Sequence, residues 1–223
     1  MISFLSDLSK GITNLIYPPL CEVCGVKIEP EPKQNSLCET CKNNITLIKP
    51  AVALKHNDIN IWAVCAYEGV IKHCVHLFKY NARLNLLNAL SSLMIDFIKN
   101  HLKDKKFDLI IPVPLHGARL RERGFNQAEL LAKKISTHIS QPLCLKALKR
   151  VKPTLTQTGL SKTKRFTNLK GAFKIIRDDF VYNKNILLID DVFTTGSTIG
   201  EAAKTLLEAK AKSVEALVLA RGI

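Results

Sequence analysis

The sequence predicts an α/β protein, with a mostly parallel sheet flanked by helices and a small cysteine-rich module in front of it. Short apolar runs alternate with stretches of helical periodicity through most of the 223-residue chain. This alternation is typical of strand–helix–strand units in a parallel sheet. Near the start, four cysteines fall into two Cys-x-x-Cys pairs, which is a pattern of its own. We therefore expect a module over residues 1–48 and an α/β domain over residues 49–223.

The first twenty residues carry apolar side chains at helical spacing. These residues are Ile2, Leu5, Leu8, Ile12 and Leu15. We expect a short helix that packs on the body of the protein; a membrane-surface helix is the alternative, but its polar face has few Lys and Arg. The charged Asp7 and Lys10 argue against a secretion signal. Since no run reaches the roughly 18 apolar residues that span a bilayer, we expect a cytoplasmic protein with no transmembrane segment.

The two cysteine pairs predict a structural zinc site. Their members, separated by a 13-residue interval, are Cys21 with Cys24 and Cys38 with Cys41. Each pair can present two thiolates to one ion, and together they complete a tetrahedral sulfur shell, as in a zinc ribbon. Gly25 suits the tight turn after the first pair. Disulfides or a redox pair are alternatives, but the chain carries no mark of export and a redox site needs only one pair.

The α/β domain is expected to contain four strands and four helices. The strands are predicted over residues 61–67, 107–113, 186–189 and 214–220, and the helices over 70–80, 84–102, 117–139 and 199–210. Gly124 makes the start of the third helix uncertain. Residues 151–172 are polar and irregular, and we expect a mobile loop there. Ligands of such sheets bind beyond the carboxyl ends of the strands, so Pro112–Pro114 and Asp190–Asp191 should face one crevice.

The run over residues 186–198 has the features of a sugar-phosphate site. An apolar strand is followed by Asp190 and Asp191, and then by a loop of small residues before the next helix. The loop residues are Thr194, Thr195, Gly196, Ser197 and Thr198. Backbone N–H groups, hydroxyls and the helix N-terminus can hold a phosphate, and the carboxylates can accept ribose hydroxyls or hold Mg²⁺. A plain strand–turn–helix junction capped by Thr198 is the alternative, but it does not explain the adjacent carboxylates.

The positive charge of the chain is concentrated in one segment. The net charge is +14, and residues 130–177 contain twelve Lys and Arg but no Asp or Glu. Such a field attracts polyanions such as nucleic acid, pyrophosphate-bearing ligands or anionic lipid. We expect nucleic-acid contacts from six cations. They are Arg119, Arg121, Arg123, Lys162, Lys164 and Arg165. The three arginines before residue 124 could instead form a solvated helix face.

Four blocks, taken in order, resemble the ComF (ComFC) competence family. The blocks are the two cysteine pairs, Pro112-Val113-Pro114-Leu115 with the segment 119–128, Gln157 with Arg165 and Asn168, and the run 186–198. The last block also resembles the phosphoribosyl pyrophosphate (PRPP) loop of type I phosphoribosyltransferases. The resemblance covers nearly the whole chain. It implies a zinc module fused to a type I phosphoribosyltransferase-like domain.

The resemblance also implies roles for individual residues. Val113 and Pro114 would lie on the pyrophosphate side of the crevice, and Asp190 and Asp191 would meet the ribose hydroxyls or Mg²⁺. The loop residues 194–198 would surround the 5′-phosphate. A flexible loop would cover the ligand and carry four polar side chains. These are Arg150, Gln157, Arg165 and Asn168.

The resemblance implies a role in natural transformation, with single-stranded DNA and PRPP or a related phosphate as ligands. Expected partners are DNA-uptake proteins at the inner membrane, with the chain in the cytoplasm or peripheral to that membrane. The alternative function is an active Mg²⁺-dependent phosphoribosyltransferase, and a third is a PRPP-sensing regulator. The phosphate machinery is complete in the sequence, but no acceptor site is recognisable. We therefore favour the DNA-uptake function over the enzyme.

Overall fold

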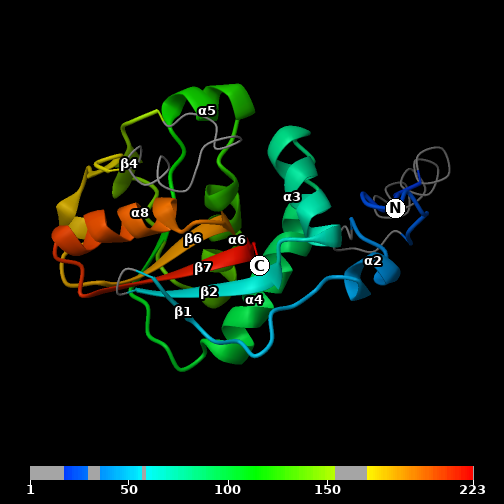
Figure 1. Ribbon diagram of the computed structural model, residues 1–223, viewed down its shortest axis with the longest axis horizontal. Helices are drawn as coiled ribbons and strands as arrows, with labels where there is room; N and C mark the ends of the chain where they lie inside the picture. Colours follow the sequence, from blue (N-terminus) through cyan, green and yellow to red (C-terminus); the bar gives the residue numbers. More distant parts are fainter. Residues whose placement is uncertain (1–17, 30–35, 57–58, 154–169, 223) are drawn as a thin grey trace, which may run out of the picture.

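The computed structural model describes residues 18–29, 36–56, 59–153 and 170–222. A five-stranded sheet with the order β1-β2-β7-β6-β3 forms its centre (Figure 1). The strands are β1 (Leu54–His56), β2 (Ile59–Ala66), β3 (Leu109–Pro112), β6 (Asn185–Phe193) and β7 (Ser213–Arg221). Only β1 runs antiparallel to its neighbour, and the other pairs are parallel. The predicted fold class is therefore confirmed.

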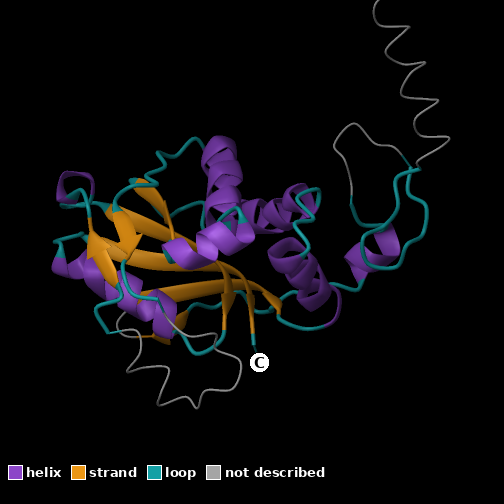
Figure 2. Ribbon diagram, turned by 90° about the horizontal axis from the view of Figure 1, so that it is seen from above, coloured by secondary structure: helices purple, strands orange, loops and turns teal. Residues whose placement is uncertain are grey.

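Helices cover both faces of this sheet (Figure 2). One face carries α3 (Gly69–Tyr80), α4 (Leu86–His101) and α6 (Gln127–Ile139), and the other carries α8 (Ser197–Glu208). Alternate residues of β6 divide between the two layers, as the period of a strand requires. Leu187 and Ile189 pack with the three-helix layer, whereas Ile186 and Leu188 pack with α8. Burial on both faces explains why this strand reads as a continuous apolar run.

The structure corrects the predicted helix over residues 117–139, which is two helices. The first is α5 (Gly117–Arg123), and it ends at Gly124, whose φ of +79° is left-handed. The second, α6, begins after Asn126, whose side chain accepts a hydrogen bond from the Ala128 N–H at 3.1 Å. A left-handed glycine followed by an asparagine N-cap ends one helix and starts the next. The chain therefore changes direction at a point where the periodicity alone suggested continuity.

Three short strands lie outside the predicted set. β1 forms one edge of the main sheet, and β4 (Leu148–Arg150) pairs antiparallel with β5 (Phe173–Ile175). Each has only three residues, too few for alternation to be recognised in the sequence. A 3₁₀ turn at Asp178–Phe180 leads from β5 towards β6.

The cysteine module rests on the three-helix layer. It contains α2 (Glu39–Asn43), whose first residue follows Cys38. Cys21, Ile28, Leu37 and Cys41 belong to the same buried cluster as residues of α3, α4 and α6. The module is therefore packed onto the body rather than built around a core of its own. The predicted N-terminal helix, residues 1–17, lies outside the described residues.

Candidate functional site

The carboxylates Asp190 and Asp191 lie inside β6, because this strand continues beyond the predicted end at Ile189. On one side β6 stays paired with β7 as far as Phe193. On the other side its neighbour β3 ends, with Pro112 opposite Ile189 as the last pair. The Val113 N–H still donates to the Ile189 carbonyl at 2.9 Å. The segment after β3 and the carboxylates of β6 therefore meet at one edge of the sheet. The sequence predicts a crevice at this place, and we call it the crevice for that reason.

The loop from Phe193 to the start of α8 closes one side of the crevice. Gly196 precedes the helix with a left-handed φ of +76°, so α8 begins at Ser197. The Thr195 and Ser197 hydroxyls lie 3.0 Å apart. Thr194 is exposed, whereas Ser197 is buried. Hydroxyls next to the N–H groups of a helix N-terminus match the needs of a phosphate.

A histidine from β1 packs against this loop. A Cβ atom on Gly196 would lie 2.6 Å from Nε2 of His56 and 2.8 Å from the Phe193 ring. The rings of His56 and Phe193 meet edge to face at 5.8 Å. The contact therefore requires glycine at position 196 for space as well as for backbone conformation.

Asp191 is neutralised by a lysine of the three-helix layer. Lys79 Nζ, near the C-terminal end of α3, lies 2.7 Å from Asp191 Oδ1, and both side chains are less than one-fifth exposed. Burial lowers the pKa of Lys79, but the charge of Asp191 outweighs it, so the pKa lies above its usual value. For Asp190, burial and then the charge of Asp191 raise the pKa to about 7. Two adjacent carboxylates, one of them paired with Lys79, therefore favour a cation or a hydroxyl-rich ligand.

Two arginines add positive charge near the carboxylates. Arg150, predicted in the flexible loop, lies at the end of β4 with 7% of its surface exposed, and its guanidinium packs on the Phe173 ring at 5.6 Å. Burial and then the charge of Arg119 lower its pKa, while Asp190 acts in the opposite direction. The charges of Arg119 and Asp190 therefore both act on Arg150.

The three arginines of α5 have different surroundings. Arg119 is half-buried and Arg121 is exposed. Arg123 donates to Gln127 Oε1 at 2.8 Å and packs over the Tyr80 ring at 5.2 Å. The predicted arginines therefore all lie on α5, and Arg123 packs on Tyr80 and Gln127.

A hydrogen bond from the start of α6 holds the segment after β3 in place. The Asn126 side chain donates through Nδ2 to the Val113 carbonyl at 3.1 Å, and its Oδ1 caps α6. Val113 is buried and Pro114 is partly exposed. The predicted residues of this segment and of the loop 194–198 are thus brought to the same end of the sheet. Five further predicted site residues lie outside the described residues. They are Gln157, Lys162, Lys164, Arg165 and Asn168.

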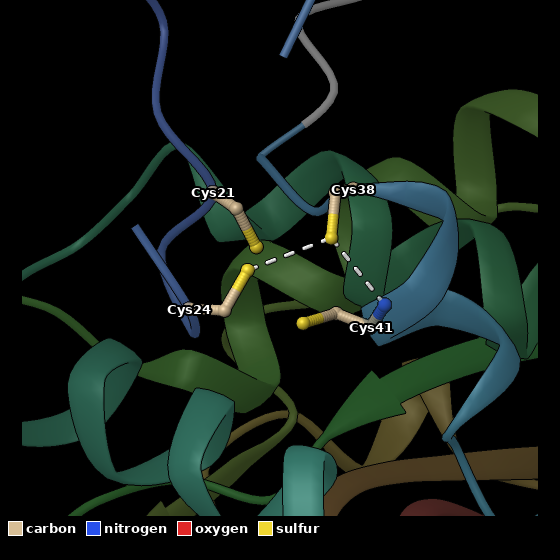
Figure 3. Close-up of side chains that lie close together, drawn as sticks. All are labelled: Cys21, Cys24, Cys38 and Cys41. Carbon is tan, nitrogen blue, oxygen red and sulfur yellow. Dashed lines mark hydrogen bonds between the residues drawn. The ribbon is translucent and has the colours of Figure 1, made fainter. Parts of the chain in front are cut away.

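The four predicted metal ligands converge in the module (Figure 3). All four sulfur atoms lie within 4.8 Å of one another, and those of Cys24 and Cys38 are 3.6 Å apart. Sulfur atoms about 3.8 Å apart surround a tetrahedral zinc with Zn–S distances of about 2.3 Å. Gly25 has the expected left-handed φ, +72°. The donor set and its spacing therefore fit a structural zinc ion.

Backbone N–H groups lie close to two of the four sulfur atoms, whereas burial and the neighbouring sulfur atoms raise the pKa of Cys41. The Cys41 N–H points to the Cys38 sulfur at 3.4 Å. Burial opposes ionisation of Cys21, but N–H donors nearby outweigh it and lower its pKa. In contrast, burial raises the pKa of Cys65 and of Cys74 to about 12. These two behave as apolar core residues.

Sequence reasoning missed Lys79 and His56. Lys79 is 112 positions before its partner Asp191, and His56 is in a strand of three residues. A single lysine near the end of an amphipathic helix has no distinctive local pattern. Only the packing of α3 and β1 around β6 brings these side chains to the crevice.

Curated proteins with related sequences are competence and DNA utilization proteins. "Competence protein ComFC" of Bacillus subtilis is 32% identical over 91% of this chain and 78% of its own length. "Competence protein F" of Haemophilus influenzae is 36% identical over 66% of each chain. "DNA utilization protein YhgH" of Escherichia coli K12 is 33% identical over 71% of this chain and 70% of its own.

Solved structures with a similar arrangement include two enzymes of phosphoribosyl chemistry. A purine phosphoribosyltransferase from Pyrococcus horikoshii has a TM-score of 0.39 at 20% identity, over 60% of this chain and 73% of that one. The glutamine PRPP amidotransferase of B. subtilis has a TM-score of 0.45 at 18% identity, over 65% and 30%. No protein-family model matches. Because the match to the B. subtilis protein spans most of both chains, this chain belongs to the ComF family of competence proteins.

Proposed function

We propose that this chain acts in DNA uptake during natural transformation, by binding single-stranded DNA on a scaffold that also holds a PRPP-type phosphate. The observation that carries the proposal is the meeting of three groups at the crevice. Carboxylates come from β6, hydroxyls come from the start of α8, and cations come from α3, α5 and β4. The names of the curated relatives support the DNA-uptake role.

The phosphate part of the site would be formed by residues 194–198. N–H groups at the start of α8 and the hydroxyls of Thr195 and Ser197 would hold the 5′-phosphate. Asp190 and Asp191 would accept ribose hydroxyls or hold a Mg²⁺, which would offset the charge of a diphosphate. Val113 and Pro114 would border the diphosphate, with Arg150 close to the carboxylates. In this arrangement the loop and the two carboxylates recognise a phosphorylated ribose.

The nucleic-acid part would use the cations around this crevice. Arg119 and Arg121 on α5 can contact backbone phosphates, because guanidinium groups bind them bidentately. We propose that Lys162, Lys164 and Arg165, outside the described residues, extend the same surface. No helix in the described part of the chain is long and apolar enough to cross a bilayer. We place the protein in the cytoplasm or at the periphery of the inner membrane, beside the DNA-uptake proteins.

Salt dependence tests the nucleic-acid proposal. Binding of a labelled single-stranded oligonucleotide is measured by fluorescence anisotropy at 50 and 200 mM salt. If phosphate contacts carry the affinity, it should fall about tenfold or more over this range, because counterions are released on binding. Arg121→Ala should weaken binding, whereas Lys204→Ala, an exposed cation near the C-terminal end of α8, should leave it unchanged. An affinity that does not vary with salt would contradict the proposal.

A second candidate is a Mg²⁺-dependent phosphoribosyltransferase that transfers the ribose phosphate to an acceptor. The observation that favours it is the intact pair of carboxylates beside the start of α8. Titration calorimetry with PRPP and Mg²⁺ should detect binding, and Asp190→Ala or Asp191→Ala should remove it. Release of pyrophosphate in the presence of an acceptor would distinguish the enzyme from a binding protein. Wild-type protein that gives no heat with PRPP would exclude both uses of the loop.

A competition experiment tests whether one crevice serves both ligands. The labelled oligonucleotide is bound at low salt and PRPP with Mg²⁺ is added. Displacement of the oligonucleotide would support a shared site, and inorganic sulfate at equal ionic strength is the control for screening. If PRPP binds by calorimetry without displacing the oligonucleotide, DNA occupies another surface.

A further inference from the structure

Helix α3 lies between the cysteine module and the crevice and contacts both. From the contacts at its two sides we propose that Lys79 is a positioning residue, which couples the order of the cysteine module to the orientation of Asp191. The proposal deepens the phosphate-binding function proposed above and rests on it where ligand affinity is concerned. It assigns the module a second role besides folding, namely to fix one wall of the crevice.

The module shares a buried cluster with the middle of α3 and contacts the segment just beyond its end. Cys74, in the middle of α3, is fully buried in the cluster that contains Cys21 and Cys41. Beyond the helix, Glu22 of the module accepts from Asn85 Nδ2 at 2.6 Å and lies 3.6 Å from Arg83 Nε. The Ser36 hydroxyl also donates to the Asn85 carbonyl. Along the chain, Lys79 therefore lies between two places where the module packs, Cys74 and the segment 83–85.

The other side of the same helix end contacts the crevice. Lys79 binds Oδ1 of Asp191 at 2.7 Å. The preceding residue, Phe78, packs on Phe125 with ring centroids 5.8 Å apart. The following residue, Tyr80, receives the Arg123 guanidinium on its ring at 5.2 Å. Three consecutive residues of α3 thus contact β6, the end of α5 and the segment that joins α5 to α6.

The ion pair transmits the position of α3 because it is short and largely buried. With Oδ1 of Asp191 committed to Lys79, the second carboxylate oxygen is left for a ligand hydroxyl. Removing one partner of such a pair leaves an uncompensated charge in a poorly solvated place. A small shift of α3 would therefore turn the Asp191 carboxylate or break the pair. The module can affect the crevice in this way without contacting a ligand.

Calorimetry with PRPP and Mg²⁺ on the full zinc-loaded chain tests the coupling. Lys79→Met should weaken PRPP about tenfold, a typical size for coupling between sites, and Lys79→Arg should restore most of the affinity. Lys72→Met, an exposed lysine earlier in α3, is the matched control and should bind as the wild type does. Removing zinc with a chelator should weaken PRPP in the wild type, but change the Lys79→Met protein by less than about twofold. Additive effects of zinc removal and Lys79→Met would overturn the proposal.

Hydrogen exchange without any ligand separates this proposal from the proposed function. Zinc removal should accelerate exchange of the amides over residues 190–196 in the wild type and in Lys72→Met. In Lys79→Met those amides should already exchange faster and should respond little to zinc. If PRPP does not bind but this pattern holds, the phosphate function fails and the coupling stands. If zinc removal leaves residues 190–196 unchanged in the wild type, the coupling fails whatever the affinity for PRPP.

Discussion

At the scale of single residues, two constraints require glycine at position 196, beside the crevice. Gly196 has a φ of +76°, and a Cβ atom at this position would overlap the His56 and Phe193 rings. Gly124 has a similar φ of +79° but open space around it. The two positions therefore share a left-handed backbone and differ in the space available for a side chain.

We predict that Gly196→Ala costs more stability than Gly124→Ala. A left-handed alanine costs about 1 kcal/mol, and the overlap at position 196 should bring the total to about 2–3 kcal/mol. Urea unfolding measures both values. Adding His56→Ala to Gly196→Ala should recover part of the loss, whereas it should give no recovery when added to Gly124→Ala. Equal costs at the two glycines would show that the His56 contact is unimportant.

The raised pKa of Asp190 predicts a pH dependence of stability. Burial and the charge of Asp191 raise the pKa to about 7, whereas an unfolded Asp titrates near 4. The folded state therefore binds this proton more tightly than the unfolded state does. The stability that the protonated form provides is complete below about pH 4 and is lost as the pH rises through about 7.

We therefore expect Asp190→Asn to stabilise the unliganded protein at high pH. The gain should be on the order of 2 kcal/mol at pH 8 and should shrink as the pH falls below 6. Urea unfolding of the wild type and of Asp190→Asn, at pH 8 and at a pH below 6, measures this gain in stability. Asp96→Asn, at an exposed position of α4, is the control and should show no such trend. A gain that is the same at both pH values would contradict the raised pKa.

At the scale of elements, the sequence predicts what is long and periodic, and fails where structure depends on short segments or distant contacts. The strand over residues 186–189 and the helix over 70–80 correspond to β6 and α3, because their apolar patterns extend over enough residues. The predicted helix over 117–139 is two helices, because Gly124 ends the first and Asn126 caps the second. The strands β1, β4 and β5 exist through pairing, and three residues do not reveal a pairing partner.

The same division applies to the site. Asp190, Asp191 and the hydroxyl loop follow one another in the chain, so the sequence could predict that they act together. Lys79 and His56 reach the crevice from elements that pack around β6, and no local pattern reports this packing. Arg150 was recognised only through the family resemblance, and the structure places it in β4 beside Phe173.

Asn126 links two elements and gives a prediction at this scale. Its Oδ1 caps α6, and its Nδ2 holds the Val113 carbonyl after β3. We expect Asn126→Ala to cost about 1–2 kcal/mol, since it removes a cap and leaves a buried carbonyl without its donor. Asn126→Asp keeps the acceptor for the cap but loses the donor to Val113. If the link matters to the crevice, both variants should weaken PRPP in calorimetry, and normal affinity in Asn126→Asp would show that it does not.

At the scale of the whole molecule, the cysteine module and the body share one buried cluster. Cys21 and Cys41 belong to one buried cluster with residues of α3 and α4, so a zinc ion that ordered the module would also support the layer beneath the sheet. A module of this size folds mainly through its metal. Loss of the metal should therefore destabilise the body of the protein as well as the module.

We predict that zinc removal lowers the melting temperature of the whole chain. Calorimetry should show one cooperative transition with zinc and a transition at lower temperature without it, with a shift of about 5 °C or more, equivalent to roughly 2 kcal/mol for a chain of this size. Anaerobic purification and elemental analysis should find one zinc per chain. An unchanged main transition after zinc removal would mean that the body is stable without the module.

The two outer strands of the sheet have a consequence for behaviour at high concentration. β1 has only three residues and exposes Lys55, and the free side of β3 is covered by residues 142–144, with Cys144 N–H donating to the Ile110 carbonyl. Short, charged or covered edges resist addition of a strand from another molecule. We therefore expect little edge-to-edge aggregation through β1 or β3.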